Sequence, residues 1–116
     1  VSDDLGRILV TMLDAGKVVS SVCHGPAGLL PAKRADGSWL FAGRRLTAFT
    51  DAEEQQAGLA DQAPWLLESR LREAGAAFSS GEAWAPFVVV DDNLVTGQNP
   101  ASSAEAAQKV LELLKA

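Results

Sequence analysis

At 116 residues the chain has room for one small domain, and 47% hydrophobic and 22% charged residues are typical of a folded globular protein. A net charge of −5 argues against binding nucleic acid or an anionic membrane, because phosphate binding needs a basic patch and the basic residues are scattered. No apolar run approaches the ~18 residues of a membrane span, and a single cysteine excludes an internal disulfide, so we expect a cytoplasmic protein.

The first part of the chain predicts a helix, a buried strand and a sharp turn. Apolar residues recur at helical spacing over 5–13, after an N-cap at Ser2 and before a glycine. The run 18–22 is short, β-branched and apolar at both ends, which predicts a buried strand. At Cys23 the periodicity changes, and the segment 27–30 predicts a short helix.

The middle of the chain predicts two strands and two helices. After a polar turn, the segments 39–41 and 44–49 have the composition of strands separated by a glycine. The segment 50–53 is a capping box, so a helix begins there. A further helix is expected over 64–74, because a proline suits its first position and a glycine follows its last.

The last part predicts a hairpin and a terminal helix. Strands at 87–90 and 94–96 flank a tight turn rich in aspartate and asparagine. Asn99, which precedes a proline, is expected to cap the helix that follows. Three apolar residues are expected to form the buried stripe of that helix: Val110, Leu111 and Leu114.

The alternation of helices and strands predicts an α/β fold with helices on both faces of a sheet. Only the strand at 18–22 has a helix on each side, whereas a doubly wound sheet needs more such units. Residues 1–116 therefore resemble one C-terminal portion of a larger sheet. Since exposed strand edges drive pairing, we expect self-association or pairing with a missing N-terminal half.

Cys23 lies where a strand meets a helix, and this position favours a reactive thiol. Ligands bind at the carboxyl ends of the strands in an open parallel sheet. Backbone N–H groups and the helix dipole stabilise negative charge there, so we expect a lowered thiol pKa. His24 is the only histidine, and as an imidazolium it would lower the thiol pKa further and carry a proton. Gly25 and Pro26 suit a sharp turn into the helix.

A structural interpretation of these two residues has about equal weight. A lone cysteine after an apolar strand is commonly a small buried hydrophobe, and a lone histidine is commonly a hydrogen-bonded structural residue. Residue type and position alone leave both interpretations of Cys23 and His24 open.

Four segments closely resemble the DJ-1/PfpI superfamily, in the order in which that family carries them. The first, 19–30, resembles the family's nucleophile elbow around Cys23. The others are LTAFTDAEE at 46–54, WAPFVVVD at 84–91 and VTGQNPAS at 95–102. The sequence looks most like the Hsp31-like branch, known for glutathione-independent glyoxalase III and holdase chaperone activity. Members are also described as ThiJ/PfpI or class I glutamine amidotransferase-like proteins.

The resemblance implies a three-layer, flavodoxin-like fold with a mainly parallel sheet, and a catalytic triad. Cys23 matches the nucleophile, His24 the neighbouring histidine, and Glu54 the carboxylate of the F-T-D-x-x-E pattern. Glu53 occupies the third helical position of the capping box, which leaves Glu54 free; Glu53 is the alternative if the register shifts by one. The structural alternative for Glu54 is an acid that only complements the helix dipole. We expect no metal or cofactor, because too few ligands and no nucleotide motif are present.

The resemblance implies cysteine-dependent chemistry on small reactive aldehydes, such as methylglyoxal to lactate. Two other functions remain open: a stress holdase that binds unfolded proteins through an apolar patch, and a peptidase or amidase that uses the same cysteine. An acidic residue and a glycine-rich oxyanion turn that the family carries before this region have no counterpart in the sequence. We expect a preceding segment or a separate chain to supply them.

Three polar or aromatic residues lie in the resembling segments near the expected site. We expect Trp84 to pack and to form a wall of the pocket, and Asn99 to cap a helix rather than contact a ligand. Gln98 has no assigned role.

Overall fold

The computed structural model describes residues 2–115, and its helices and strands alternate along the chain. The elements in chain order are α1 (Asp3–Asp14), β1 (Val19–Val22), the 3-10 helix η1 (Gly25–Leu29), β2 (Arg45–Leu46), α2 (Asp51–Gln56), α3 (Leu67–Ala74), β3 (Ala77–Phe78), β4 (Val88–Asp91), β5 (Leu94–Gly97), the 3-10 helix η2 (Pro100–Ser102) and α4 (Ser103–Lys115). None of the helices in 2–115 is long and apolar enough to cross a lipid bilayer.

The main sheet has the strand order β1-β5-β4. β1 runs parallel to β5, with Val19 opposite Leu94 and Val22 opposite Gly97. β4 and β5 form an antiparallel hairpin around the turn at Asp92, which has a positive φ of 56°. β2 and β3 form a second, two-stranded parallel ladder. Parallel pairing therefore predominates, as expected for this α/β fold.

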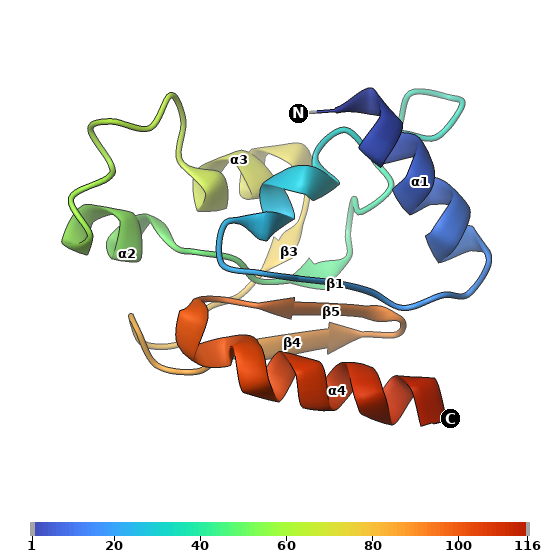
Figure 1. Cartoon of the computed structure of the whole chain (residues 1–116). Helices are drawn as coiled ribbons and strands as arrows, with labels where there is room; N and C mark the ends of the chain where they lie inside the picture. The colour runs from blue at the N-terminus through green and yellow to red at the C-terminus, as the bar shows by residue number, and fades with distance from the viewer. Residues whose placement is uncertain (1, 116) are drawn as a thin grey trace.

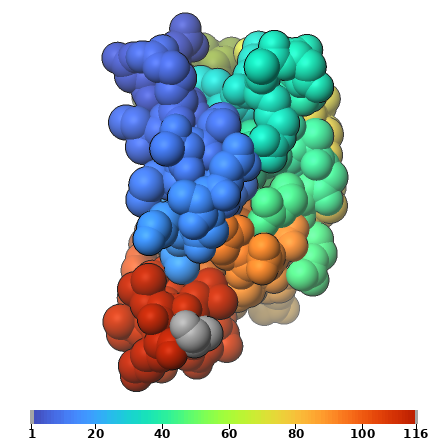
Figure 2. Space-filling model, turned by 90° about the vertical axis from the view of Figure 1, so that its right-hand side faces the viewer, coloured from blue at the N-terminus to red at the C-terminus, as the bar shows by residue number. Residues whose placement is uncertain are grey.

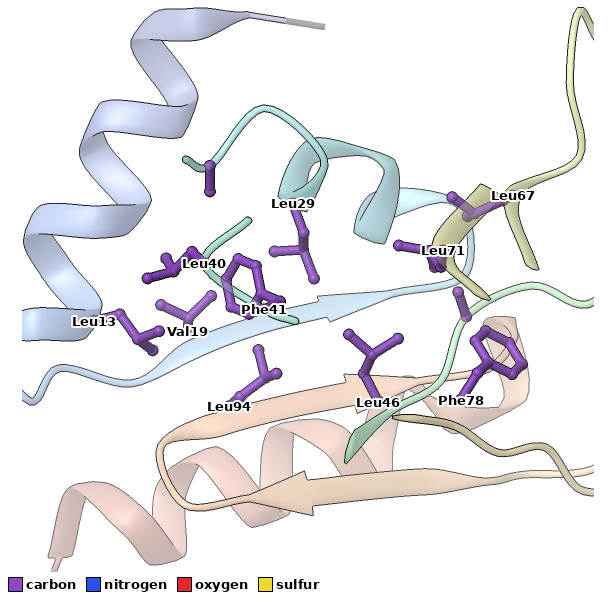
Figure 3. Close-up of a cluster of buried hydrophobic side chains, with 12 residues drawn as sticks. Leu13, Val19, Leu29, Leu40, Phe41, Leu46, Leu67, Leu71, Phe78 and Leu94 are labelled. Carbon is purple, nitrogen blue, oxygen red and sulfur yellow. The ribbon is translucent and has the colours of Figure 1, made fainter. Parts of the chain in front are cut away.

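Helices cover both faces of the sheet, which gives three layers (Figure 1). α4 lies against one face, while α1, η1 and α3 lie on the other (Figure 1). Apolar side chains from α1, η1 and α3, from the strands and from the segment after η1 converge on the face of the sheet opposite α4 (Figure 3). The cluster includes Leu13, Val19, Leu29, Leu40, Phe41, Leu46, Leu67, Leu71, Phe78 and Leu94. This core fixes the end of β1, where Cys23 follows.

The structure corrects three of the expected elements. Residues 39–41 form no strand: Trp39 makes only an isolated antiparallel bridge with Lys33, and Leu40 and Phe41 are buried in a turn, so burial explains their apolar character. The strand expected over 44–49 is reduced to β2, because the chain leaves the ladder after Leu46. The helix expected over 64–74 begins only at Leu67, and β3 was not predicted.

Two predicted apolar stripes are only partly covered. On α1, Leu13 is buried, but Ile8 is 57% exposed. On α4, Leu111 and Leu114 are exposed by 51% and 66%, so the expected buried stripe is wrong at these two positions. α4 instead turns Ala106 toward the sheet. Figure 2 shows α1 and α4 exposed on one side of the molecule.

Candidate active site

The backbone at Cys23 makes the sharp turn from β1 into η1. Cys23 has a φ of 61°, the left-handed region that side chains other than glycine rarely adopt. Its N–H donates to the carbonyl of Gly97 at 2.9 Å, and its carbonyl accepts from the N–H of Phe49 at 2.8 Å. A Cβ at Gly25 would collide with the Ser21 hydroxyl, so a larger residue there would force that side chain to move. Such a strained turn presents the thiol above the end of the strand.

The structure brings Cys23, His24 and Glu54 together. Cys23 Sγ lies 3.6 Å from His24 Nδ1, and His24 Nε2 contacts Glu54 Oε1. The Glu54 carboxylate is almost fully buried, while the His24 side chain is 51% exposed. With the Nε2 proton donated to Glu54, the Nδ1 lone pair faces the thiol. Glu54, not Glu53, is therefore the carboxylate in contact with the imidazole.

The pKa of the Cys23 thiol is not lowered but raised, so this expectation was wrong for the chain described here. Burial raises the pKa most, and the negative charges of Glu53 and Glu54 raise it further. A hydrogen bond from the His24 backbone lowers it without offsetting these effects. The helix that follows is a five-residue 3-10 helix, which provides a weaker dipole than the α-helix we assumed. A thiol of this kind needs a base to remove its proton.

Asn99 occupies the N-cap position before Pro100, as expected, but its side chain makes no capping hydrogen bond. The η2 turn precedes α4, and the Asn99 amide instead donates to Glu53 and to the carbonyl of Ala85. The capping box itself is present, with Thr50 and Glu53 bonded to each other's backbone N–H groups. Gln98 is buried and accepts a hydrogen bond from the N–H of Gly81, so its role is to hold the loop before β4.

A pocket of about 330 Å³ opens beside His24 and Glu54. Its far wall is the loop between α2 and α3, which arches away from the sheet (Figure 1). The residues that this loop contributes are Leu59, Gln62, Ala63, Pro64 and Trp65. Sequence reasoning missed this wall, because it assigned 64–74 to a helix. Trp84 is not among the lining residues; it packs on Phe49 instead.

Within residues 2–115, no three His, Cys, Asp or Glu side chains gather closely enough to hold a metal ion. The chemistry that these residues themselves support is nucleophilic attack by Cys23, with His24 as the base and Glu54 as the group that orients it.

Several named proteins are similar to this chain in sequence. Glutamine amidotransferase-like class 1 domain-containing protein 1 of Bos taurus is 38% identical over 112 residues, covering 97% of this chain and 51% of that protein. Glyoxalase 3 of Candida albicans is 38% identical over 116 residues, covering 93% of this chain and 48% of that protein. The chain thus spans about half the length of these relatives.

Solved structures share the fold. The crystal structure of glyoxalase III from Candida albicans superposes with a TM-score of 0.86 and 34% identity, over 95% of this chain and 48% of that chain. The model of the DJ-1/PfpI family matches residues 1–113. Nearly the whole of the chain is therefore accounted for, and it belongs to the DJ-1/PfpI family.

Proposed function

We propose that this protein converts small reactive aldehydes to hydroxy acids without cofactor or glutathione, with methylglyoxal to lactate as the representative reaction. The observation that carries the proposal is the contact of Cys23 with His24 and of His24 with Glu54. The similarity to Glyoxalase 3 supports the choice of substrate class. We assign the reaction to the cytoplasm, where a lone thiol stays reduced.

The proposed reaction uses the aldehyde and water as its only reactants. His24 Nδ1 takes the Cys23 proton as the sulfur bonds to the aldehyde carbon and the C=O bond opens, and the imidazolium returns this proton to the aldehyde oxygen. The resulting hemithioacetal keeps the hydrogen on that carbon. A proton then moves from this carbon to the neighbouring carbonyl carbon through an enediol, which oxidises the first carbon and reduces the second. Water hydrolyses the resulting lactoyl thioester, which releases lactate and restores the thiol.

The raised pKa of Cys23 supports a role for His24 as the base. A thiol that is mostly protonated near neutral pH depends on a base at the moment of attack. Glu54 is buried behind the imidazole and stabilises the imidazolium that forms.

The test measures lactate formation from methylglyoxal, without glutathione, on the longest form of the protein that contains this chain. Cys23→Ser abolishes the reaction. His24→Ala and Glu54→Gln each lower kcat by about 10²-fold or more. The matched control, Glu73→Gln, makes the same change on an exposed residue of α3 and keeps the wild-type rate. Retained activity in Cys23→Ser would sink the proposal, and release of amines from amides or peptides in place of lactate would favour the hydrolase.

A holdase is the second candidate, and the exposed apolar residues of α1 favour it. Leu5, Ile8 and Met12 are exposed by 38%, 57% and 41%, which suits contact with an unfolded chain. Light scattering of a heat-denatured client protein separates the two functions. A holdase is unaffected by Cys23→Ser but loses its protection with Ile8→Lys.

A further inference from the structure

Glu53, which precedes the proposed catalytic Glu54, has a fully buried carboxylate with more partners than a helix cap requires. Its Oε1 accepts from the Thr50 N–H and the Thr50 hydroxyl, both at 3.0 Å. Its Oε2 accepts from the N–H of Trp84 at 2.8 Å and from the Asn99 amide at 2.9 Å. A capping box accounts for the hydrogen bonds of Oε1 only. The second oxygen binds a different part of the chain.

The second oxygen holds the loop before β4 in an unfavourable conformation. Trp84 has a φ of 67°, and a bulky residue in this left-handed region is strained. The bond from its N–H to the Glu53 carboxylate is charge-assisted, which offsets that strain. Asn99 adds a second tie, since its amide also donates to the carbonyl of Ala85 at 2.7 Å. Glu53 thus holds the backbone from which the Trp84 side chain projects.

The Phe49 ring lies between the Trp84 ring and the His24 imidazole and packs against both. Trp84 packs edge-on against Phe49, with ring centroids 5.4 Å apart, and Phe49 packs on His24 with centroids 4.4 Å apart. Trp84 is also tied at its indole, which donates to the side chain of Gln56 at 2.8 Å. Phe49 is buried, so it transmits the position of Trp84 to the face of the imidazole.

We infer that Glu53 is a positioning residue, which holds Trp84 against Phe49 and thereby fixes the plane of the His24 ring. Glu54 holds one edge of that ring at Nε2, whereas Glu53 acts on its face through two aromatic side chains. The value of this placement for catalysis depends on the proposed function, but the placement itself is measurable without any turnover. Glu54 would then hold the imidazole by direct contact, and Glu53 would position it through aromatic packing.

Two substitutions separate this role from simple capping. Glu53→Gln replaces one carboxylate oxygen by an NH₂ group. If the remaining oxygen accepts from Thr50, the NH₂ group faces the N–H donors of Trp84 and Asn99 and cannot accept a hydrogen bond from either. Thr50→Ala, the matched control, removes the capping hydroxyl and leaves the bonds to Trp84 and Asn99 in place. Both variants destabilise the protein, so loss of stability alone does not distinguish them.

The readouts are the NMR signals of the His24 ring and of the Trp84 indole N–H, together with kcat and KM. His24 is the only histidine, so its ring signals are unambiguous. Glu53→Gln shifts both signals and lowers kcat by about tenfold with little change in KM, because misplaced groups slow the chemistry. Thr50→Ala leaves both signals and kcat at their wild-type values.

A double-mutant cycle tests whether the effect passes through Trp84. In a Trp84→Ala background, Glu53→Gln produces no further shift of the His24 signals if Trp84 transmits its effect. A further shift in that background, or equal shifts in Thr50→Ala and Glu53→Gln, would overturn the inference. If Glu53→Gln fails to fold, Asn99→Ala makes the same comparison on the Oε2 side alone. If the wild type does not act on aldehydes, the proposed function fails, while the NMR signals still decide the role of Glu53.

Discussion

Cys23 combines a strained backbone turn with a negatively charged environment. The left-handed φ presents the thiol, whereas burial and the charges of Glu53 and Glu54 keep its proton on. Such a thiol resists unselective oxidation and alkylation better than a free thiolate does.

The pH dependence of alkylation follows from the raised pKa. The rate of reaction of Cys23 with iodoacetamide rises with pH, and its midpoint lies above the ordinary value for a thiol, which is about 8.5. Glu54→Gln removes a negative charge that raises this pKa, so the midpoint falls in that variant. A wild-type midpoint clearly below the ordinary value would show that the thiolate is stabilised, and that our electrostatic account of the site is incorrect.

At the scale of single elements, α1 shows how a helix can require a residue with poor helix propensity. Gly6 lies in the middle of α1 and is buried against Pro31. A Cβ at this position would lie 2.8 Å from the Pro31 carbonyl carbon, and backbone atoms cannot move aside easily. The glycine is therefore the residue that lets α1 approach the segment after η1.

Gly6→Ala is expected to destabilise the protein by about 1–3 kcal/mol, because the overpacking outweighs the gain in helix propensity. Urea unfolding measures the difference. Thr11→Ala serves as the control, since Thr11 is exposed on the same helix and the substitution gains propensity without a clash. Stabilisation by Gly6→Ala would mean that α1 lies further from Pro31 than the structure shows.

Asp91 joins β2 to the main sheet. Its side chain accepts from Arg44 at 3.0 Å and from the Arg45 N–H at 2.8 Å. Burial raises the pKa of Asp91, but these hydrogen bonds and charges lower it more, so the net pKa lies below its ordinary value. The carboxylate therefore contributes stability above the pKa of the unfolded state, and this contribution is lost as pH falls through the folded-state pKa.

Asp91→Asn is expected to cost about 1.5–3 kcal/mol near pH 7, the range for hydrogen bonds to a charged group. The difference from wild type shrinks toward about pH 2, where the wild-type carboxyl is also neutral. Urea unfolding across this pH range provides the measurement. A difference that stays constant with pH would mean that shape, not charge, is what Asp91 contributes.

Local signals predicted some elements and failed at others for physical reasons. The caps of α1 and α2 depend on neighbouring residues, so Ser2 and Thr50 identified both helix starts. The strand expected at 39–41 failed because burial inside a turn produces the same apolar run as a strand. The Leu67 start of α3 was missed because Pro64 suits a loop as well as a helix. Pairing of β2 with β3 is set by distant residues, which local composition does not encode.

At the scale of the molecule, the sequence identified the residues of the candidate site but not their electrostatics. Cys23, His24 and Glu54 were predicted because they lie in segments that resemble a family. The direction of the thiol pKa depends on how close Glu53 and Glu54 come to the sulfur, and only the fold determines that. The pocket wall between α2 and α3 has no pattern of its own in the sequence.

The exposed apolar residues of α1 and α4 predict that the isolated chain associates. Ile8 and Leu114 are exposed by 57% and 66%, and Figure 2 shows both helices at the surface, although they cover opposite faces of the sheet. Light scattering after size exclusion at micromolar concentration should give a mass above that of a monomer. Ile8→Lys lowers the mass, whereas Gln55→Lys, which adds the same charge on exposed α2, does not. A monodisperse monomer would contradict the prediction.

Hydrogen exchange at single backbone amides of β1 reports whether another strand docks on its free edge. Val19 and Cys23 donate their N–H groups toward the β5 side, so by alternation along a strand the N–H groups of Ser20 and Val22 point away from it. In the part of the chain that the structure describes, no strand pairs with that edge. Hydrogen exchange at Ser20 and Val22 should therefore be fast in the isolated chain, while exchange at Ser21 is slow. A strand that docks on β1 slows exchange at Ser20 and Val22 and leaves Ser21 unchanged.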